Sequence, residues 1–226
     1  FILSRAESYI GTLIDDLVTK GTNEPYRMMT SRTEYRLIQR QDNADQRLTP
    51  IGYQIGLVSR ERYEAVQAKY QAVEQEIQRL EHSGTPATDP LNQMLTSHGE
   101  PAARHAVKLA DLLRRPRISY ADLAPFDPTR PELDRLITEQ VEIQLKYEGY
   151  IARQEKQVVE FEKAERRLLP PDIDYNAISG LRLEARQKLS EIRPLSIGQA
   201  SRISGVNPAD ITALLVWLEH TRRAAQ

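Results

Sequence analysis

The sequence predicts a protein that is all-α in the main, on three observations. Apolar residues make up 40% of its 226 residues, which is enough for a core, whereas aromatic residues make up only 6%. Charged residues reach 28%, a composition that favours long solvated helices over a compact sandwich or barrel. Two long segments, 60–82 and 131–168, carry apolar residues at helical spacing. We therefore expect an elongated helical bundle with two long antiparallel helices, followed by a small C-terminal helical subdomain.

The first segment, residues 1–45, differs from this helical pattern. A short apolar run, 9–14, is followed by residues 20–25, Lys-Gly-Thr-Asn-Glu-Pro, which are typical of a turn. The alternation in 35–40 suits a short strand, but the spacing of the arginines there also suits a helix. We expect an irregular segment with a possible short strand.

Helix signals dominate from residue 42 onward. Asp42 or Asn43 can cap a turn, and Thr49 before Pro50 reads as an N-cap followed by the first helical residue. Ser59 then precedes a helix over 60–82, whose apolar residues form one stripe: Tyr63, Val66, Tyr70, Val73, Ile77 and Leu80.

Two shorter helices are expected next, over 90–95 and 101–113, before a break at Arg115–Pro116. A helix over 131–168 would be about 55 Å long. Because Leu136, Ile143 and Tyr150 repeat every seven residues, we expect it to pair with the helix over 60–82 as in a coiled coil.

The last part, residues 172–226, predicts short helices with tight turns. Ser196 starts one helix, Gly205 breaks it, and residues 207–210, Asn-Pro-Ala-Asp, open the next with a capping box. The pair resembles a helix-turn-helix, which binds DNA in many proteins but is equally a generic corner that packs on a partner. DNA is the less favoured reading, because 207–218 offers few polar side chains to contact base edges.

Several kinds of site are disfavoured. Neither the dinucleotide-binding glycine pattern nor the P-loop occurs, and the absence of cysteine excludes disulfides and thiolate metal sites. The four histidines lack metal-ligand spacing, so we expect no metal site. Adjacent Asp15 and Asp16 could bind a cation or transfer protons, but more often such a pair is the polar end of an apolar run. We name no catalytic residue.

The net charge and the hydropathy of the sequence restrict which partners and which cellular compartment we expect. The net charge of −1 creates no global field for nucleic acid or membrane, so such binding depends on local clusters. No stretch approaches the roughly 20 apolar residues that cross a bilayer. We expect a cytoplasmic protein without membrane contact. Because the sequence begins at Phe1 without an initiating Met, we also expect a piece of a longer chain.

Local basic clusters are the strongest functional signal from composition. Five arginines lie between residues 27 and 47, three cations lie in 114–117, and five lie between 182 and 202. Arginine offers a planar fork that suits phosphate. The alternative is that these side chains are solvated or paired with acids along their helices.

Three stretches in order resemble one family. They are 14–28, IDDLVTKGTNEPYRM, with 30–37, TSRTEYRL, and 42–49; then 139–144, EQVEIQ, with 146–151, KYEGYI; and finally 193–194 with 196–206, SIGQASRISGV. Together they strongly resemble the C-terminal third of the MnmG family, also called glucose-inhibited division protein A. This sequence departs from the family at Met29, where an aromatic residue is commoner, and at Gln39 and Gln41, which makes charge at those points less important.

The resemblance implies a tRNA-modifying flavoenzyme. Members form 5-carboxymethylaminomethyluridine at the tRNA wobble position, using FAD, NADH and a methylene-tetrahydrofolate carbon source. They work with an MnmE-type GTPase, and we expect a homodimer of the full-length protein. The flavin site would lie outside this sequence, so no cofactor is expected within it. The implied division is 1–45 as the C-terminal edge of a flavin-binding domain, 46–171 as a long-helix bundle, and 172–226 as a small helical subdomain.

The resemblance therefore implies that this chain is a region that docks tRNA and a partner protein and that it does not catalyse a reaction by itself. The alternative is a helical protein–protein interaction module without direct tRNA contact. The candidate tRNA-binding residues are Lys20, Arg27, Arg32, Arg36, Arg40, Arg114, Arg115 and Arg202. The candidate partner-binding residues are Ile197, Gln199, Ile203, Val206 and Leu215.

Overall fold

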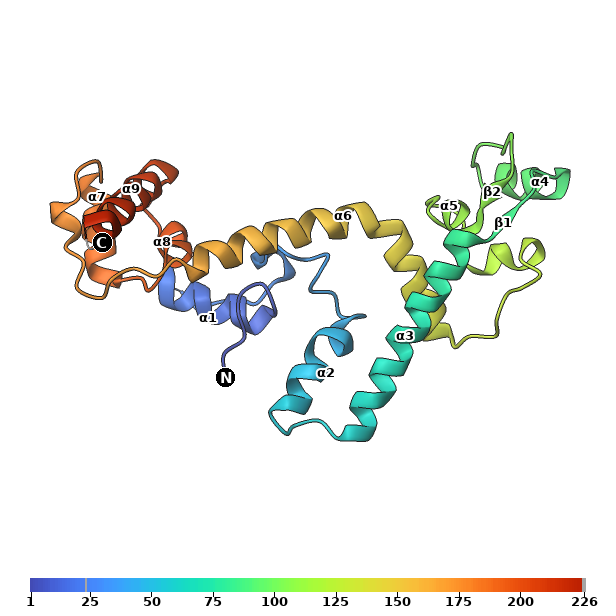
Figure 1. The fold of residues 1–226 in the computed structure, drawn as a ribbon, viewed down its shortest axis with the longest axis horizontal. Coiled ribbons are helices and arrows are strands. Elements are labelled where there is room, and N and C mark those ends of the chain that lie inside the picture. Colours follow the sequence, from blue (N-terminus) through green and yellow to red (C-terminus); the bar gives the residue numbers. More distant parts are fainter. Residues whose placement is uncertain (23, 225–226) are drawn as a thin grey trace. The chain divides into compact units, whose positions relative to one another are not determined.

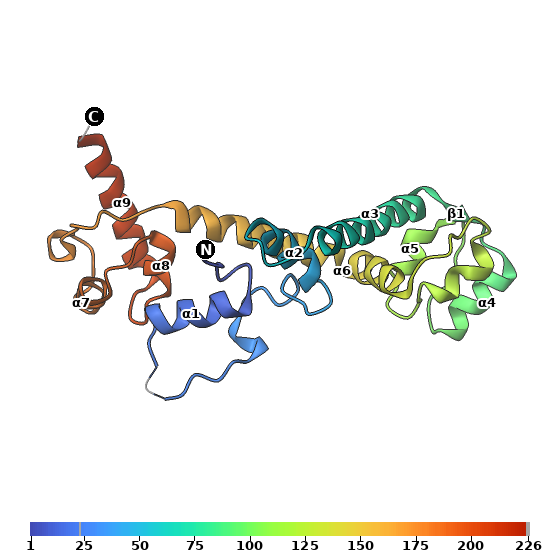
Figure 2. The same ribbon diagram turned by 90° about the horizontal axis from the view of Figure 1, so that it is seen from below.

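The computed structural model describes residues 1–22 and 24–224. Helices dominate it, and the described residues form one sheet of two short strands, as Figures 1 and 2 show. The prediction of a mainly α-helical fold is therefore confirmed. The helices are α1 (Tyr9–Thr19), α2 (Ala44–Gln54), α3 (Arg60–His82), α4 (Asp89–Ser97), α5 (Leu109–Leu113), α6 (Arg135–Arg166), α7 (Leu183–Ile192), α8 (Ile197–Arg202) and α9 (Pro208–Ala224), and the strands are β1 (Gly84–Thr85) and β2 (Val107–Lys108).

The chain divides into two compact units. The terminal unit comprises residues 1–39 and 153–226, and the middle unit comprises residues 40–152. Helix α6 contributes its first part to the middle unit and the remainder to the terminal unit. Segments far apart in the sequence therefore share the terminal unit.

In the middle unit, α3 begins and ends where the sequence predicts. The Ser59 hydroxyl accepts a hydrogen bond from the backbone N–H of Arg62, which caps the helix start. Helix α2 precedes α3 through a turn at Gly56, whose φ of 77° suits glycine. Across this turn the rings of Tyr53 and Tyr63 stack with centroids 4.5 Å apart.

The middle unit has one apolar core. Helix α3 supplies Val73 and Leu80 to it, and α6 supplies Val141 and Leu145. Burying this set provides the main stabilisation of the unit. The other buried members are Leu91, Leu95, Leu109, Ala110, Leu112, Leu113, Ile118, Tyr120 and Leu123.

The predicted coiled-coil seam of α6 is wrong. Leu136 and Tyr150, which belong to the seven-residue repeat, are 60% and 58% exposed. The buried positions in the first part of α6 are instead Gln140, Val141 and Leu145. In this part of α6 the buried side chains pack into the core of the middle unit. The residues at heptad spacing therefore do not form a continuous coiled-coil interface.

Two further details of the middle unit correct the sequence reading. Thr49 and Pro50 do not start a helix but lie inside α2, which begins after Asn43. Only Leu109–Leu113 of the expected helix over 101–113 is helical, because Val107 and Lys108 pair with β1 instead. The Asn92 side chain also holds Ala103 through two hydrogen bonds, which replace helical bonding there.

Helices α7, α8 and α9 pack around the core of the terminal unit. The predicted capping box of α9 is confirmed: the backbone N–H of Asp210 donates to Asn207 Oδ1 and that of Asn207 donates to Asp210 Oδ2, each at 2.9 Å. The predicted start of α8 is confirmed as well, since the Ser196 hydroxyl accepts from the N–H of Gln199. The core residues are Leu169, Ile173, Tyr175, Ile178, Leu181, Ala185, Leu189, Ile197, Ala200, Ile203 and Leu214.

The N-terminal segment is more regular than the sequence suggested. Residues 9–19 form α1, with Ser8 accepting a hydrogen bond from the N–H of Gly11 at its start. A Cβ at Gly11 would lie 2.1 Å from the Ser4 carbonyl oxygen, so only glycine fits. Residues 35–40 are not a strand. Their backbone is held by a side chain, since Leu37 N–H donates to Gln154 Oε1.

Candidate nucleic-acid interface

A basic loop, residues 20–36, follows α1 in the terminal unit. Asn23 lies outside the described residues, and a short 3₁₀ turn, Thr30–Arg32, is the loop's regular element. The loop carries four cations, all exposed: Lys20, Arg27, Arg32 and Arg36. It also carries two carboxylates, Glu24 and Glu34.

Arg5 is the buried anchor of this loop. It is 3% exposed, and its Nη1 lies 3.0 Å from Asp15 Oδ2 and 2.7 Å from Asp16 Oδ1. Its Nε and Nη2 donate to the two carboxylate oxygens of Glu34, at 3.0 and 2.9 Å. One guanidinium therefore ties α1 to the far end of the loop.

Asp16 fixes the near end of the loop. The Tyr26 hydroxyl donates to its Oδ2 at 2.7 Å, and the Lys20 ammonium lies 2.9 Å from its Oδ1. Burial alone would raise the pKa of Asp16, but the hydrogen bonds from Lys20, Tyr26 and Arg5, with the charge of Arg5, outweigh it. They lower the pKa to about 2, so the carboxylate stays charged.

Internal pairing leaves the loop's outer arginines uncompensated. Asp15, Asp16 and Glu34 all engage Arg5. Within the described part of the chain, Arg27 and Arg36 are exposed and form no ion pair. The Arg32 guanidinium instead lies 4.7 Å from the ring centroid of Tyr26, a cation–π contact that orients it without neutralising it. The arrangement presents three guanidinium groups on a loop whose backbone is anchored, which suits an extended polyanion.

The remaining predicted tRNA-binding residues have other surroundings. Lys20 pairs with Asp16, as described above, and Arg40 belongs to the middle unit, where its Nε lies 3.1 Å from Asp42. Arg202, on α8, is mostly buried against two carboxylates: it donates to both oxygens of Asp15, at 2.7 and 2.8 Å, and to Glu165 at 2.6 Å. Its guanidinium is therefore engaged within the fold.

The second basic cluster lies in the middle unit, at the end of α5. Arg114 contacts three carboxylates: Glu81, Asp111 and Glu148. The hydrogen bonds from Arg114 to Glu81 and Glu148, the one to Glu81 foremost, raise its pKa above the usual range together with the charges of these two acids. Arg115 donates to the Pro101 carbonyl oxygen at 2.5 Å. The charge of Arg114 is compensated locally, so these two residues remain weaker candidates than those of the basic loop.

The predicted partner-binding residues separate into two groups. Ile197 and Ile203 lie in the core of the terminal unit, at 3% and 2% exposure, so their side chains hold the fold. Gln199, Val206 and Leu215 are half-buried and reach the surface in part. Partner contact through these positions stays a prediction.

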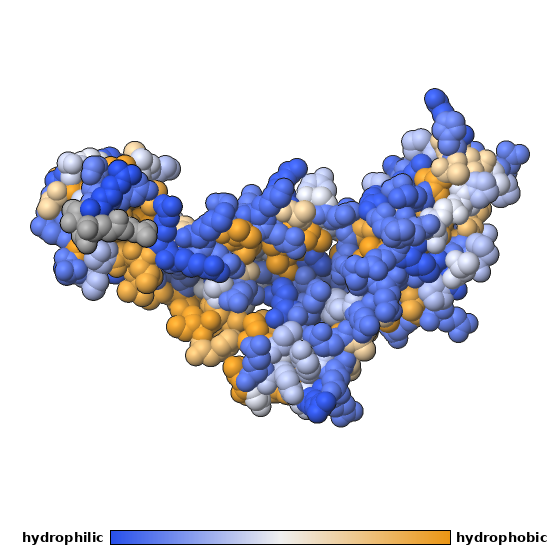
Figure 3. All heavy atoms as spheres, in the orientation of Figure 1, coloured by the Kyte–Doolittle hydropathy of each residue, from blue (hydrophilic) through white to orange (hydrophobic). Residues whose placement is uncertain are grey.

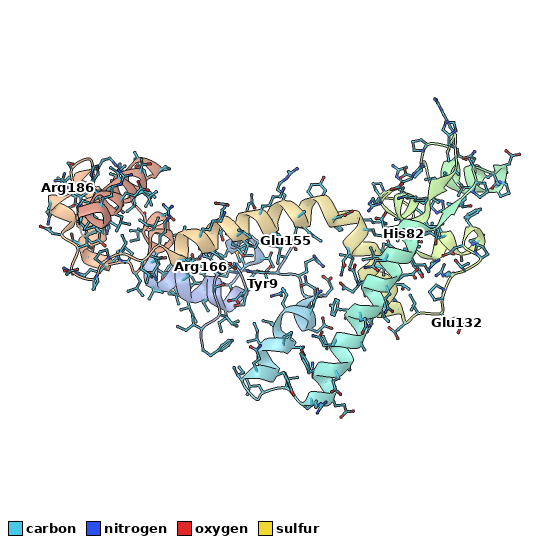
Figure 4. The ribbon with its side chains drawn as sticks, viewed as in Figure 1. Tyr9, His82, Glu132, Glu155, Arg166 and Arg186 are labelled. Carbon is cyan, nitrogen blue, oxygen red and sulfur yellow. The ribbon has the colours of Figure 1, made fainter. Side chains whose placement is uncertain are left out.

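A shallow hollow of about 480 Å³ adjoins Leu215. Its apolar lining is Leu168, Pro170, Leu215 and Leu218, with Arg166, Arg167, Glu219 and Thr221 around it. Figure 4 shows Arg166 near the C-terminal end of α6. A mixed apolar and charged lining of this kind suits a protein partner.

Sequence reasoning missed the two residues that organise the basic loop. Arg5 was not singled out, and Asp16 was considered only as half of an acidic pair. Glu34 lies 29 residues from Arg5, so no local spacing reveals their pairing. The one available signal was the adjacency of Asp15 and Asp16, two acids that need cations when a helix buries them.

The described residues do not fit a bound dinucleotide. Glycines with positive φ occur at separate turns, and none of them follows a strand to open a helix as a phosphate-binding loop requires. In the same residues there is no group of three or more side chains placed to hold a metal ion, and no helix long and apolar enough to cross a bilayer.

Comparison with known proteins identifies the family. Residues 60–155 match the model of the tRNA modifying enzyme MnmG/GidA C-terminal helical domain, and residues 157–226 match that of the MnmG/GidA C-terminal helical bundle. The chain is 57% identical over 225 residues to the tRNA uridine 5-carboxymethylaminomethyl modification enzyme MnmG of Caldicellulosiruptor saccharolyticus, covering 100% of this chain and 36% of the relative. It is 54% identical to the MnmG of Lachnoclostridium phytofermentans, covering 98% of this chain and 35% of the relative.

Solved structures agree. GidA of Aquifex aeolicus in its form II crystal has a TM-score of 0.78 and 41% identity, covering 96% of this chain and 34% of that one. The form I crystal gives a TM-score of 0.76 at the same identity, with 33% of that chain covered. The chain thus spans about a third of the length of the relatives it matches. The chain belongs to the MnmG/GidA family and corresponds to the C-terminal helical part of its members.

Proposed function

We propose that this chain is the tRNA- and partner-docking region of an FAD- and NADH-dependent enzyme that forms 5-carboxymethylaminomethyluridine at the tRNA wobble position in the cytoplasm. The matched relatives are named for a tRNA uridine modification. The flavin would be held by the part of the longer protein outside this chain and would supply the redox chemistry. The residues described above bind and orient the substrate.

The observation that carries this proposal is the anchored basic loop. Arg27, Arg32 and Arg36 are exposed, while the nearby acids Asp15, Asp16 and Glu34 are held by Arg5. Anchoring matters because ordering a free loop on binding costs conformational entropy. A loop that is already fixed loses little of this entropy, so more of its electrostatic attraction to phosphate contributes to the binding affinity.

Charge removal in the full-length protein tests this role. We expect Arg36→Gln and Arg27→Gln each to weaken tRNA binding, and each lost phosphate contact to reduce the slope of log affinity against log salt by about one unit. Arg62→Gln is the matched control, because Arg62 is an exposed arginine in the middle unit whose side chain forms no ion pair with residues 1–22 or 24–224. If both loop variants kept the affinity and slope of the control, the loop would have a structural role only.

A protein–protein role has a separate observation in its favour. The hollow beside Leu215 has an apolar floor, and its rim residue Leu168 is 70% exposed. We propose that the MnmE-type GTPase docks there. Leu168→Arg should abolish capture of the GTPase by the full-length protein, whereas Leu183→Arg, at a similarly exposed leucine (72%) on α7, should retain it. Equal capture by both variants would remove the hollow as the docking site.

A deletion is a coarser test of the partner role, because residues 196–226 also supply core residues of the terminal unit. Removing the terminal helix pair, residues 196–226, should eliminate complex formation with the GTPase. If complex formation survived the deletion, the partner interface would lie elsewhere. Homodimer formation by the full-length protein is a further part of the proposal, and sedimentation of the intact enzyme measures it.

A further inference from the structure

Asp15 is shared between two buried arginines that come from opposite ends of the chain. Its Oδ2 lies 3.0 Å from Arg5 Nη1 and accepts a hydrogen bond from Arg202 Nε at 2.7 Å, while its Oδ1 accepts from Arg202 Nη2 at 2.8 Å. The side chain of Arg5 is 2% exposed, and those of Asp15 and Arg202 are each 13% exposed. One carboxylate on α1 therefore connects the N-terminal segment to α8, 187 residues further along the chain.

These contacts belong to a line of charged groups of alternating sign, which we call the ion-pair chain: Glu165, Arg202, Asp15, Arg5 and Glu34. Arg202 Nη1 donates to Glu165 Oε1 at 2.6 Å, and Arg5 Nη2 donates to Glu34 Oε1 at 2.9 Å. Every member lies in the terminal unit. Because the groups in the middle of the line are shielded from water, the position of each one depends strongly on the charge of the next.

One end of the ion-pair chain lies beside the hollow that we assign to the GTPase. Glu165 immediately precedes Arg166, which lines the hollow, and its Oε2 accepts a hydrogen bond from the Ser196 hydroxyl at 3.1 Å. Ser196 in turn forms a backbone bridge with the rim residue Leu168. Figure 3 shows hydrophilic and apolar residues side by side on the surface at this end of α6. A molecule that contacts the rim therefore acts on the residues that hold Glu165.

The other end of the ion-pair chain sets the course of the basic loop. Glu34 stands between Arg32 and Arg36 in the sequence. Arg5 donates to the Glu34 carboxylate and also, at 3.4 Å, to the backbone carbonyl oxygen of Arg32. Arg5 thereby fixes the backbone from which these two exposed arginines project. Any displacement of Arg5 moves both cations relative to a bound phosphate backbone.

A second, uncharged route runs beside the ion-pair chain. The Arg202 guanidinium lies 5.1 Å from the ring centroid of Phe161 on α6, and the centroids of Phe161 and Tyr35 are 6.0 Å apart. Tyr35 is buried and directly follows Glu34 in the basic loop. A close-packed interior has few voids that could absorb a displacement, so a shift at one end is passed on. Charges and rings together therefore join α8 to the basic loop.

We propose that Asp15 and Arg202 are positioning residues that couple the hollow to the basic loop. This inference rests on the proposed function, which assigns the hollow to the GTPase and the loop to tRNA. Docking of the GTPase restrains Leu168 and, through Ser196, helix α8, and the ion-pair chain passes this restraint to the loop. A restrained loop loses less entropy when it binds RNA, so tRNA binds more tightly to the GTPase-bound protein. By thermodynamic reciprocity, tRNA strengthens GTPase binding by the same factor.

The tRNA affinity of the full-length protein, measured with and without saturating MnmE-type GTPase, tests this coupling. In the unsubstituted protein we expect the GTPase to tighten tRNA binding by at least about five-fold, the lower end of typical coupling between sites. Asp15→Asn and Arg202→Lys should reduce this factor to about one, because each removes the bidentate pair with little change in side-chain size. Glu155→Gln is the matched control and should keep the full factor, since Glu155 is an exposed glutamate on α6 in the same unit (Figure 4).

Two further readouts separate lost coupling from the loss of either site. Without the GTPase, Asp15→Asn and Arg202→Lys should keep the salt slope of tRNA binding, because no phosphate contact is removed, and both variants should still capture the GTPase. A five-fold tightening that persists in both variants would overturn the proposal. A factor of about one in an unsubstituted protein that binds both tRNA and the GTPase would overturn it too, while leaving the proposed function intact. An unsubstituted protein that failed to bind one of them would instead contradict the proposed function, and this inference with it.

Discussion

Asp16 is the residue on which the geometry of the basic loop depends most. It accepts hydrogen bonds from Arg5 and Tyr26 and pairs with Lys20, and it is only 4% exposed. Replacing its carboxylate leaves the buried guanidinium of Arg5 with Asp15 and Glu34 alone. A buried cation that loses one of its anionic partners destabilises the folded state.

We expect Asp16→Asn to lower the free energy of unfolding by about 2 kcal/mol at pH 6, the range for a hydrogen bond to a charged group. The one tryptophan, Trp217, packs against the core of the terminal unit, so its fluorescence during urea unfolding reports on that unit. Asp172→Asn, at an exposed aspartate, is the control and should change little. An unchanged stability in Asp16→Asn would show that the Arg5 cluster does not hold the loop.

The same residue gives a pH dependence. The pKa of Asp16 is about 2 in the folded state, against 3.8 as the ordinary value. A group whose pKa is depressed stabilises the fold above its unfolded pKa, and this contribution is lost as pH falls through the folded pKa. The stability difference between the protein and Asp16→Asn should therefore narrow from about pH 4 down to about pH 2, by roughly 2 kcal/mol. A constant difference from pH 6 to pH 2 would contradict the depressed pKa.

At the scale of elements, sequence patterns predicted the helices whose own signals agree with their packing. The helix over 60–82 was predicted to the residue, because Ser59 caps it and its apolar stripe supplies the core residues Val73 and Leu80. The capping box at Asn207 was also predicted correctly. Where the capping group lies within three residues of the helix start, the local sequence contains the whole interaction.

Elements that depend on contacts with distant residues could not be predicted from the local sequence. Helix α1 was read as irregular because its buried face is polar and its apolar face is not covered within this chain. The expected helix over 101–113 was interrupted by pairing of Val107 with Thr85 and by the side chain of Asn92. A local periodicity cannot reveal such partners, since tertiary contacts override propensity.

Asp210 gives the element-scale prediction. It is fully buried, accepts from the backbone N–H of Asn207, and pairs with Arg182 at 2.8 Å. We expect Asp210→Ala to lower the free energy of unfolding by about 3 kcal/mol, because it removes a helix cap and leaves Arg182 without the carboxylate that accepts its hydrogen bonds. Glu219→Ala, at an exposed position of the same helix α9, should stay within about 0.5 kcal/mol. Urea unfolding followed through Trp217 measures both, and equal effects would mean that the capping box adds nothing.

At the scale of the whole molecule, composition and helical periodicity were enough to predict the helical class, and three sequence stretches in order were enough to predict the family. The sequence also indicated the candidate arginines for tRNA binding, but it could not separate the exposed arginines from those paired within the fold. Arg202 and Arg27 look alike in the chain, yet Arg202 is paired with Asp15 and Glu165 whereas Arg27 is exposed. Only the position of acids from distant segments distinguishes an arginine that holds the fold from one that faces solvent.

The division of labour in the terminal unit follows from this distinction. Buried arginines and acids join segments 1–39 and 153–226, and exposed arginines remain for a polyanion. A search based on basic residues alone therefore selects both groups. Charge compensation separates them, and under the proposed function it favours the basic loop as the tRNA-binding surface.

The measurement that tests this most directly is a titration of the chain with tRNA at several salt concentrations. The account predicts a linear fall of log affinity with log salt, and a slope smaller by about 2–3 units when Arg27, Arg32 and Arg36 are all changed to Gln, because up to three phosphate contacts are lost. Changing Arg202 instead should lower stability without this loss of slope in the folded fraction. If the triple variant bound tRNA with the slope and affinity of the unsubstituted chain, the basic loop would not be a tRNA-binding surface.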